Sequence, residues 1–310
     1  MKRCRIVSVS CTDPYRNQAV EELLLQNVEE DEHILYLWQN DRTVVIGRNQ
    51  DAARECDLEA LQSDGGRAAR RLSGGGAVYH DMGNLNYTFL SARASHDVKR
   101  QTGIILDAVA SFGIHAQCTG RNDLTIEGRK FSGSAYYDNG HAKLHHGTIL
   151  IDTDPACMAR YLTPSRQKLA SKGVASVSSR VGCLRELDSS LNVEKVREAL
   201  VDAFCRSFAP GEVVTSGDDA LPFDEAQITA ARSRFADRRW IVSRRTGLSR
   251  VAEFRNENGL YTIHAVVCGD VITDAQVFTD SLDPEAAAVM RRELIGRHFS
   301  DLETSPPGRA

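Results

Sequence analysis

Short runs of strand-forming residues, each bounded by turn formers, recur along most of this chain, and helical patterns interrupt them at irregular intervals. The runs expected to form strands are residues 6–9, 34–38, 43–47, 77–80, 84–90, 123–137 and 147–151. The expected helices are residues 19–27, 97–112 and 192–208, where apolar residues recur at helical spacing. Because strands and helices do not alternate strictly, we expect an α+β fold with a mixed or largely antiparallel sheet and flanking helices. A doubly wound nucleotide-binding fold is not expected.

A second, smaller unit is expected near the C-terminus. Residues 209–221 contain Gly, Pro and Asp and are interpreted as a connector, and residues 236–250 are rich in arginine. After them come three further strand-like runs and one helix, with the strands at residues 251–254, 260–267 and 270–278. We therefore predict a catalytic domain over residues 1–240 and a small α/β C-terminal module over residues 250–310.

Charge and cysteine usage exclude several classes of protein. The net charge is −4, so the composition favours no nucleic-acid partner. The eight cysteines form no CxxC pair and are expected to be reduced thiols. The N-terminal apolar run is too short for a signal peptide, and no later run has the length of a membrane span. We therefore expect a cytoplasmic protein with no membrane partner.

The stretch from Arg70 to Asp81, RRLSGGGAVYHD, is the first candidate for a binding site. Three glycines leave backbone N–H groups open to a ligand, and two adjacent arginines suit a phosphate or a carboxylate. It is not a P-loop, since no Lys-Ser/Thr pair follows at the required spacing. An ordinary turn between strands is the alternative interpretation of the glycines alone.

The second candidate stretch is residues 120–136, GRNDLTIEGRKFSGSAY. Lys130 follows a tight turn, and strand alternation would place its side chain on the face opposite Phe131. A lysine in a pocket supplies a point cation for a carboxylate and a phosphate, although an isolated lysine is usually a solvated surface charge. Asn122 and Asp123 carry oxygen ligands of the kind that Mg²⁺ prefers.

A histidine pair and one cysteine are further candidates, for metal binding and for nucleophilic catalysis. His145 and His146 are expected to open a strand, but no further ligands follow at zinc-like spacing, so a hydrogen-bonding wall residue is favoured over a metal ligand. Cys118 could act as a nucleophile, although a small buried thiol is the commoner role.

Five segments, in order along the chain, resemble bacterial lipoate–protein ligases. They are residues 43–50 (TVVIGRNQ), 70–81, 120–136, 145–151 (HHGTILI) and 168–181 (KLASKGVASVSSRV). Residues 272–282 (ITDAQVFTDSL) resemble the C-terminal domain of that family, and the likeness extends over most of residues 10–285. The resemblance implies a fold like the catalytic core of biotin–protein ligases and class II aminoacyl-tRNA synthetases, with a small C-terminal domain.

The resemblance also implies roles for individual residues. Lys130 matches the family lysine that contacts both lipoate and the α-phosphate, and it is the expected catalytic residue. The matching ATP-binding positions are Arg71, Gly76, Ala77, Val78, Tyr79 and Lys130. The matching lipoate-binding positions are Trp38, Arg71, Ser73, His80, Asn84, Lys130 and His146. Residues 171–178 match a loop that closes over the adenylate, and Asp123 is the candidate metal ligand.

Two departures from the family pattern concern the C-terminal module. Residues 238–245 replace a segment in which relatives carry a second tryptophan and a proline, and the module stops at Ala310. Both leave open how the module packs against the catalytic domain and whether adenylation is impaired, whereas the segments expected to form the transfer pocket are present.

The implied activity is ATP-dependent activation of free lipoate to lipoyl-AMP, with pyrophosphate release and Mg²⁺ as the metal. Transfer of the lipoyl group to a lysine of a lipoyl domain follows. The implied acceptors are the E2 subunits of 2-oxoacid dehydrogenases and the glycine-cleavage H protein. A cysteine-dependent octanoyl or lipoyl transferase of the same fold is one alternative, with Cys118 a few residues from the matching position. A non-catalytic lipoyl-binding protein is the other, and the sequence leaves the choice between lipoate and octanoate open.

Overall fold

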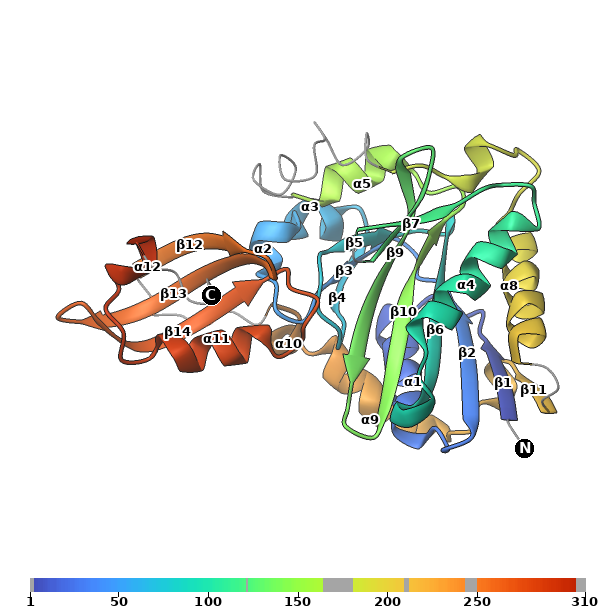
Figure 1. Cartoon of the computed structure of the whole chain (residues 1–310), viewed down its shortest axis with the longest axis horizontal. Coiled ribbons are helices and arrows are strands. Elements are labelled where there is room, and N and C mark those ends of the chain that lie inside the picture. Colours follow the sequence, from blue (N-terminus) through green and yellow to red (C-terminus); the bar gives the residue numbers. More distant parts are fainter. Residues whose placement is uncertain (1–2, 121, 164–180, 209–211, 243–249, 305–310) are drawn as a thin grey trace.

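The computed structural model of the chain describes residues 3–120, 122–163, 181–208, 212–242 and 250–304. An eight-stranded mixed sheet forms the centre of the larger body, in the order β11-β1-β2-β6-β10-β9-β8-β7 (Figure 1). The strands are β1 (Arg3–Ser8), β2 (Glu32–Trp38), β6 (Asn84–Ala92), β7 (Gln117–Thr119), β8 (Asp123–Ile126), β9 (Arg129–Asp138), β10 (Ala142–Leu150) and β11 (Glu212–Ser216). β1 pairs in parallel with both of its neighbours, and every other pair in the sheet is antiparallel.

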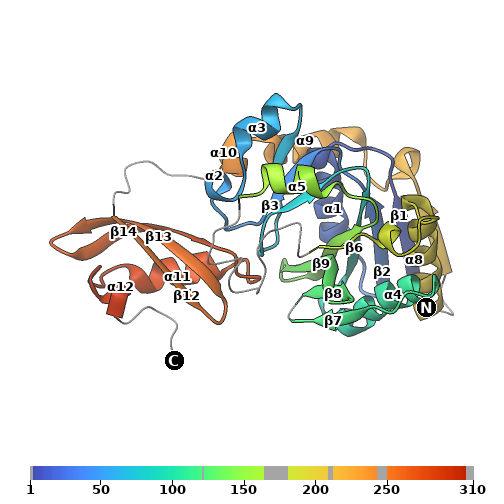
Figure 2. The same ribbon diagram turned by 90° about the horizontal axis from the view of Figure 1, so that it is seen from above.

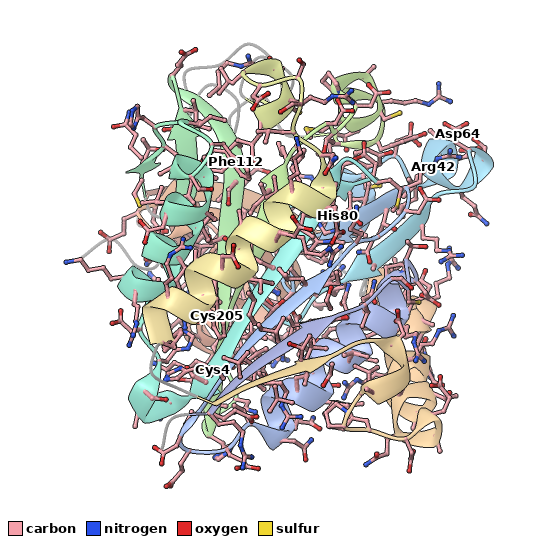
Figure 3. The ribbon with its side chains drawn as sticks, turned by 90° about the vertical axis from the view of Figure 1, so that its right-hand side faces the viewer. Cys4, Arg42, Asp64, His80, Phe112 and Cys205 are labelled. Carbon is pink, nitrogen blue, oxygen red and sulfur yellow. The ribbon has the colours of Figure 1, made fainter. Side chains whose placement is uncertain are left out.

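Helices cover both faces of this sheet. α4 (Val98–Ala110) and α8 (Val193–Phe208) pack on one face, which is turned toward the viewer in Figure 3, with Cys205 on α8 and Phe112 just after α4. α1 (Pro14–Asn27) lies on the other face and packs against α9 (Glu225–Ala236). Two separate apolar cores result, one on each side of the sheet.

A small three-stranded sheet lies beside the large one, in the order β4-β3-β5. Its strands are β3 (Thr43–Ile46), β4 (Arg67–Arg70) and β5 (Val78–His80), and the short helices around it are α2 (Ala52–Glu55), α3 (Leu58–Ser63) and α5 (Pro155–Tyr161). These elements share a core of their own. The glycine-rich stretch connects β4 to β5, so this sheet fixes both ends of the loop.

The C-terminal module has a separate, fourth core. It contains β12 (Arg250–Asn256), β13 (Gly259–Cys268) and β14 (Val271–Thr279), which form an antiparallel sheet, and the helices α11 (Ala286–Leu294) and α12 (Asp301–Thr304). The module stands to one side of the main body (Figures 1 and 2). The remaining elements are η1 (Arg93–Ser95), η2 (Leu184–Glu186), η3 (Asp218–Ala220) and α10 (Arg238–Val242).

The predicted fold class is confirmed: the molecule is α+β, with a mixed sheet, flanking helices and a small C-terminal module. α1 begins earlier than expected, because Asp13 caps it by accepting from the Tyr15 N–H and Pro14 occupies its first turn. None of the helices among the described residues combines the length and apolarity needed to span a bilayer.

Two expectations about secondary structure are wrong. Residues 209–221 are not merely a connector, because β11 extends the sheet there by parallel pairing with β1. β10 starts at Ala142, well before residue 147, because Asn139 accepts N–H bonds from His141 and Ala142 and closes the hairpin with β9. In both cases, pairing with a neighbouring strand determines where the strand forms more than the local sequence does.

Candidate active site

A pocket of about 170 Å³ opens where the α1-covered face of the large sheet, the small sheet and the C-terminal module meet. Most of the side chains singled out in the sequence line it together: Trp38, Arg71, Gly76, Ala77, Val78, His80, Asp123, Lys130 and His146. Three others, Ser73, Tyr79 and Asn84, lie behind its surface. Segments far apart in the sequence therefore converge on one site.

The glycine-rich loop is shaped by positions where a side chain would not fit. Gly75 has a φ of 89°, a conformation that favours glycine, and its N–H donates to the Ser281 carbonyl at 2.7 Å. A Cβ on Gly74 would lie 2.4 Å from the same carbonyl oxygen. The loop is thus in backbone contact with the segment that follows β14, and the C-terminal module forms one side of the pocket.

Arg70 is a structural residue. Its side chain is 1% exposed, and its guanidinium donates to backbone carbonyls that include those of Gly47, at 2.8 Å, and Ile241, at 2.7 Å. The expectation that both arginines stand at the mouth of an anion site is therefore wrong for Arg70. The reason is the alternation along β4, which turns Arg70 away from the pocket and toward α10.

Arg71 does line the pocket and organises the glycine-rich loop. Its guanidinium donates to the carbonyls of Gly74 and Gly76 at 2.6 and 2.8 Å, and to the Ser73 hydroxyl at 3.0 Å. Burial lowers the pKa of Arg71 to about 10, so the side chain stays cationic at neutral pH. A positive charge is therefore fixed beside the loop.

Lys130 extends into the pocket from β9. Its Nζ lies 2.7 Å from Oδ1 of Asp123 in β8, and the two side chains are 19% and 13% exposed. The lysine crosses the sheet over Gly133, where a Cβ would lie only 2.3 Å from Nζ. Phe131 is buried in the core on the other face, so the predicted separation of Lys130 from Phe131 is confirmed.

A chain of buried hydrogen bonds runs through the pocket wall. Nε2 of His146 lies 2.6 Å from the Ser73 hydroxyl, and Nδ1 of the same ring lies 2.8 Å from Oε1 of Glu21. The Thr88 hydroxyl donates to that carboxylate oxygen at 2.6 Å and accepts from the Trp38 indole N–H at 3.1 Å. Both ring nitrogens of His146 are therefore engaged, and the ring is held as a fixed part of the wall.

His145 has a different environment from its neighbour. The pair lies in the middle of β10, so the expectation that it opens a strand is wrong. Alternation sends His145 to the opposite face, where its Nδ1 lies 3.1 Å from the Gln101 side-chain oxygen. Burial lowers the pKa of His145 to about 3, so the ring is neutral at pH 7.

The same alternation separates the three residues of β5. Val78 and His80 line the pocket, whereas the Tyr79 side chain packs against Tyr161 with ring centroids 5.5 Å apart. Any contact between Tyr79 and a pocket ligand would therefore involve its backbone. His80, labelled in Figure 3, lies 3.2 Å from the Asn40 amide nitrogen, and burial with the nearby charge of Arg71 lowers its pKa to about 3.

Two other candidates lie outside the pocket lining. The buried Asn84 donates to the Asn86 side-chain oxygen at 2.9 Å, and Asn86 is the residue that reaches the pocket. Cys118 is exposed on β7, at the edge of the large sheet. It is absent from the described residues that line the pocket.

The sequence patterns missed several lining residues. They come from α1, β6, β10 and the C-terminal module: Gln18, Glu21, Asn86, Thr148, Arg255, Asp280 and Leu282. Gln18 and Glu21 are three positions apart, so on a helix they would lie on one face, and this spacing could have indicated that both line the pocket. Because the helix is predicted to start at residue 19, Gln18 falls outside it. No local signal indicates that Arg255 and Asp280 approach the glycine-rich loop.

Within the described ranges, no group of three or more His, Cys, Asp or Glu side chains is arranged to hold a metal ion. Asp123, the candidate ligand, is paired with Lys130. Residues 171–178, expected to close over the adenylate, lie outside the described residues.

Comparison with known proteins gives a consistent result. The model of the lipoyl protein ligase A/B catalytic domain family matches residues 13–205. Among solved structures, P. falciparum LipL1 in complex with lipoate is 28% identical, with a TM-score of 0.81, and the match covers 95% of this chain and 90% of that one.

Two further structures share the fold at lower identity. One is a bi-partite lipoate protein ligase, studied with its E2 lipoyl domain, from Thermoplasma acidophilum: it is 24% identical, with a TM-score of 0.67, and the match covers 80% of this chain and 100% of that one. The other is a lipoate-protein ligase A bound with ATP: it is 22% identical, with a TM-score of 0.66, and the match covers 78% of this chain and 99% of that one.

Proposed function

The chain belongs to the lipoyl protein ligase A/B catalytic domain family, and from this membership we propose that it is an ATP-dependent lipoate–protein ligase. In the first step, a carboxylate oxygen of lipoate attacks the α-phosphorus of ATP. The bond from that phosphorus to the bridging oxygen breaks, and pyrophosphate leaves. The product is the mixed anhydride lipoyl-AMP.

The observation that carries this proposal is the convergence of Lys130, Arg71 and the glycine-rich loop on one pocket. Two anions must meet in the first step, and catalysis consists mainly of aligning them and neutralising charge in the transition state. Lys130 lies in the pocket as a point cation, and Arg71 fixes a second positive charge beside backbone N–H groups. We assign ATP contacts to Arg71, the loop at residues 76–79 and Lys130.

The acyl chain is assigned to the part of the pocket between Lys130 and α1. Trp38, His80 and His146 line it, with Ser73 and Asn84 supporting its walls from behind. Ligand cavities in proteins are usually lined by apolar side chains together with a few fixed polar groups, and such a lining suits an apolar acyl chain.

In the second step, the amine of an acceptor lysine attacks the acyl carbon of lipoyl-AMP. The bond from that carbon to the phosphate oxygen of AMP breaks, AMP leaves, and the amine proton passes to solvent. Lys130 polarises the acyl carbonyl. We propose lipoyl domains of 2-oxoacid dehydrogenase E2 subunits and the glycine-cleavage H protein as acceptors, and the archaeal ligase described with its E2 lipoyl domain supports the first of these.

Magnesium is proposed to enter with ATP as a substrate complex. Mg²⁺ in nucleotide sites is commonly held by one or two carboxylates together with the substrate phosphates, and Asp123 supplies one carboxylate in the pocket. The ion would offset the charge of the phosphates, while Lys130 and Arg71 act on the reacting groups.

We also propose how the chain divides into two domains. Residues 1–240 form the catalytic domain and residues 250–310 the accessory domain, which contributes Arg255, Asp280 and Leu282 to the pocket. The separate apolar core of the C-terminal module supports this division.

The position of Cys118 argues against the cysteine-dependent transferase. A nucleophile that forms a thioester must reach the acyl carbon, and Cys118 lies on the edge strand β7 rather than among the described pocket residues. The non-catalytic binding protein is the remaining alternative.

One experiment separates the three activities. The purified protein is incubated with MgATP and lipoate, pyrophosphate release is measured, and a lipoyl domain is then added and its intact mass recorded. A parallel reaction without ATP contains the lipoyl domain and an octanoylated acyl-carrier protein as donor. A ligase releases pyrophosphate and adds one lipoyl group to the domain. A binding protein does neither, and a thiol-dependent transferase modifies the domain only from an acyl-carrier donor without ATP. Either of the last two results would refute the proposal.

A further inference from the structure

Gln18 is the buried polar residue of the pocket wall whose environment is hardest to explain without a ligand. It lines the pocket from α1 and is 1% exposed. Within the described part of the chain, neither its amide nitrogen nor its amide oxygen has a hydrogen-bond partner. Buried side-chain amides are nearly always paired, and one that is not calls for a specific cause.

The neighbouring polar residues of α1 show the usual pattern. Asn17 donates to the carbonyls of Cys11 and Gln39 at 2.9 and 2.8 Å. Glu21 accepts from Thr88 at 2.6 Å and lies 2.8 Å from His146. These contacts place α1 across β2, β6 and β10, so Gln18 lies between the end of β2 and the buried Glu21 network.

The register of the large sheet separates Lys130 from the Trp38 side of the pocket, where Gln18 lies. Trp38, Asn86, Thr148 and Gly133 are paired in one row across β2, β6, β10 and β9, and Lys130 lies over Gly133. The row covers three inter-strand spacings, roughly 14 Å in all. An eight-carbon acid whose carboxylate is held at Lys130 would extend along this row and bring its other end toward Trp38 and Gln18.

Other polar side-chain atoms at the Trp38 side of the pocket are also buried without a hydrogen-bond partner. Among the described residues, Nδ2 of Asn86 and Nε2 of His80 are buried without a partner, and both side chains line the pocket. With Gln18, they give the inner end of the acyl pocket several unused hydrogen-bonding groups. A plain hydrocarbon tail would cover these groups and leave them unpaired.

We propose that Gln18 selects acids whose chain ends in hydrogen-bonding sulfur atoms over acids of the same length that end in a methyl group. This inference rests on the proposed function, and it sets the preference for lipoate over octanoate. The carboxamide offers two N–H donors and one acceptor, so it pairs with the weakly accepting sulfurs of a dithiolane and also accepts from the S–H groups of the reduced dithiol.

The expected size of the effect is modest. A site that hydrogen-bonds its substrate discriminates against an analogue that leaves its buried polar groups unpaired, but sulfur is a weak partner. We expect a preference for lipoate over octanoate of about tenfold, the change that one net hydrogen bond produces.

The test is a binding experiment that needs no turnover. Dissociation constants for lipoate and for octanoate are measured calorimetrically, without ATP, on the wild type, on Gln18→Leu and on Gln18→Met. Leucine and methionine fill similar space without polar amide atoms, and methionine's flexibility provides a second variant should leucine disturb folding. The matched control is Gln26→Leu, the same change at an exposed position of the same helix.

The expected result is a ratio of dissociation constants that falls from about tenfold to near one in both Gln18 variants, mainly through tighter octanoate binding. Gln26→Leu should keep the wild-type ratio. A wild type that binds both acids equally, or a ratio unchanged by both Gln18 variants, overturns the role of Gln18 and leaves the ligase proposal standing. A wild type that binds neither acid overturns both.

Discussion

Replacing Gly133 with alanine tests whether the position of the Lys130 ammonium controls the reaction. Gly133 lies in β9 and pairs with Asp123 of β8 on one side and with Thr148 of β10 on the other. The strand backbone at this position therefore accepts alanine. The new Cβ would lie 2.3 Å from Nζ and 2.5 Å from Cε of Lys130. Carbon atoms in ordinary contact are separated by about 3.5 Å or more, so the ammonium must retreat by about 1 Å.

The displacement should affect catalysis far more than stability. A shift of about 1 Å in a group that aligns reactants reduces the rate by about 10²-fold. The atoms in conflict are the far end of a flexible side chain, which moves without disturbing the core. We therefore expect the free energy of unfolding to change by no more than about 1 kcal/mol.

The assay is the rate of pyrophosphate release at saturating lipoate and MgATP, measured together with urea denaturation. The matched control is Gly103→Ala in α4, where a Cβ meets no atom within 4 Å. That variant should be fully active and slightly more stable, by up to about 1 kcal/mol, because alanine favours helix. A folded Gly133→Ala protein whose rate lies within twofold of the wild type would show that the position of Lys130 is not critical.

Four further predictions follow from the structure. Lys130→Ala should slow both adenylation and transfer by about 10²–10³-fold with the fold intact, and near-normal formation of lipoyl-AMP would exclude the proposed role. Cys118→Ser should leave lipoylation unchanged, and an acyl-enzyme seen by mass spectrometry and lost on this substitution would favour the cysteine-dependent transferase. The pKa of His145 is lowered to about 3, so its contribution to stability is complete above pH 6.5 and is lost as pH falls toward 3, by up to about 1.4 kcal/mol per pH unit. Between pH 7 and pH 5, the free energy of unfolding measured by urea denaturation should fall less steeply for His145→Gln than for the wild type. It should fall as steeply as in the wild type for His115→Gln, a change at an exposed position. Arg70→Met should destabilise the protein by about 3–5 kcal/mol, since several buried carbonyls lose their donor, and a loss below 1 kcal/mol would contradict the structural role.

The sequence alone was sufficient for features that depend on residues close together in the chain. The helices at 98–110 and 193–208 carry a regular apolar face, and the hairpin of β8 and β9 has its turn at Glu127 and Gly128, both with positive φ. The glycine-rich loop and the lysine strand could also be identified, because their composition is unusual over a few residues. The fold class followed from the order of these elements.

Only the tertiary structure separated the roles of neighbouring residues. Arg70 and Arg71 are adjacent and chemically identical, yet one stabilises buried carbonyls and the other faces the pocket. The contribution of Gln18 from α1 and of Asp280 from the C-terminal module was likewise invisible in the chain. The physical reason is that periodicity and turn chemistry act over a few residues, whereas a pocket wall is built from segments whose approach depends on the packing of whole sheets and helices.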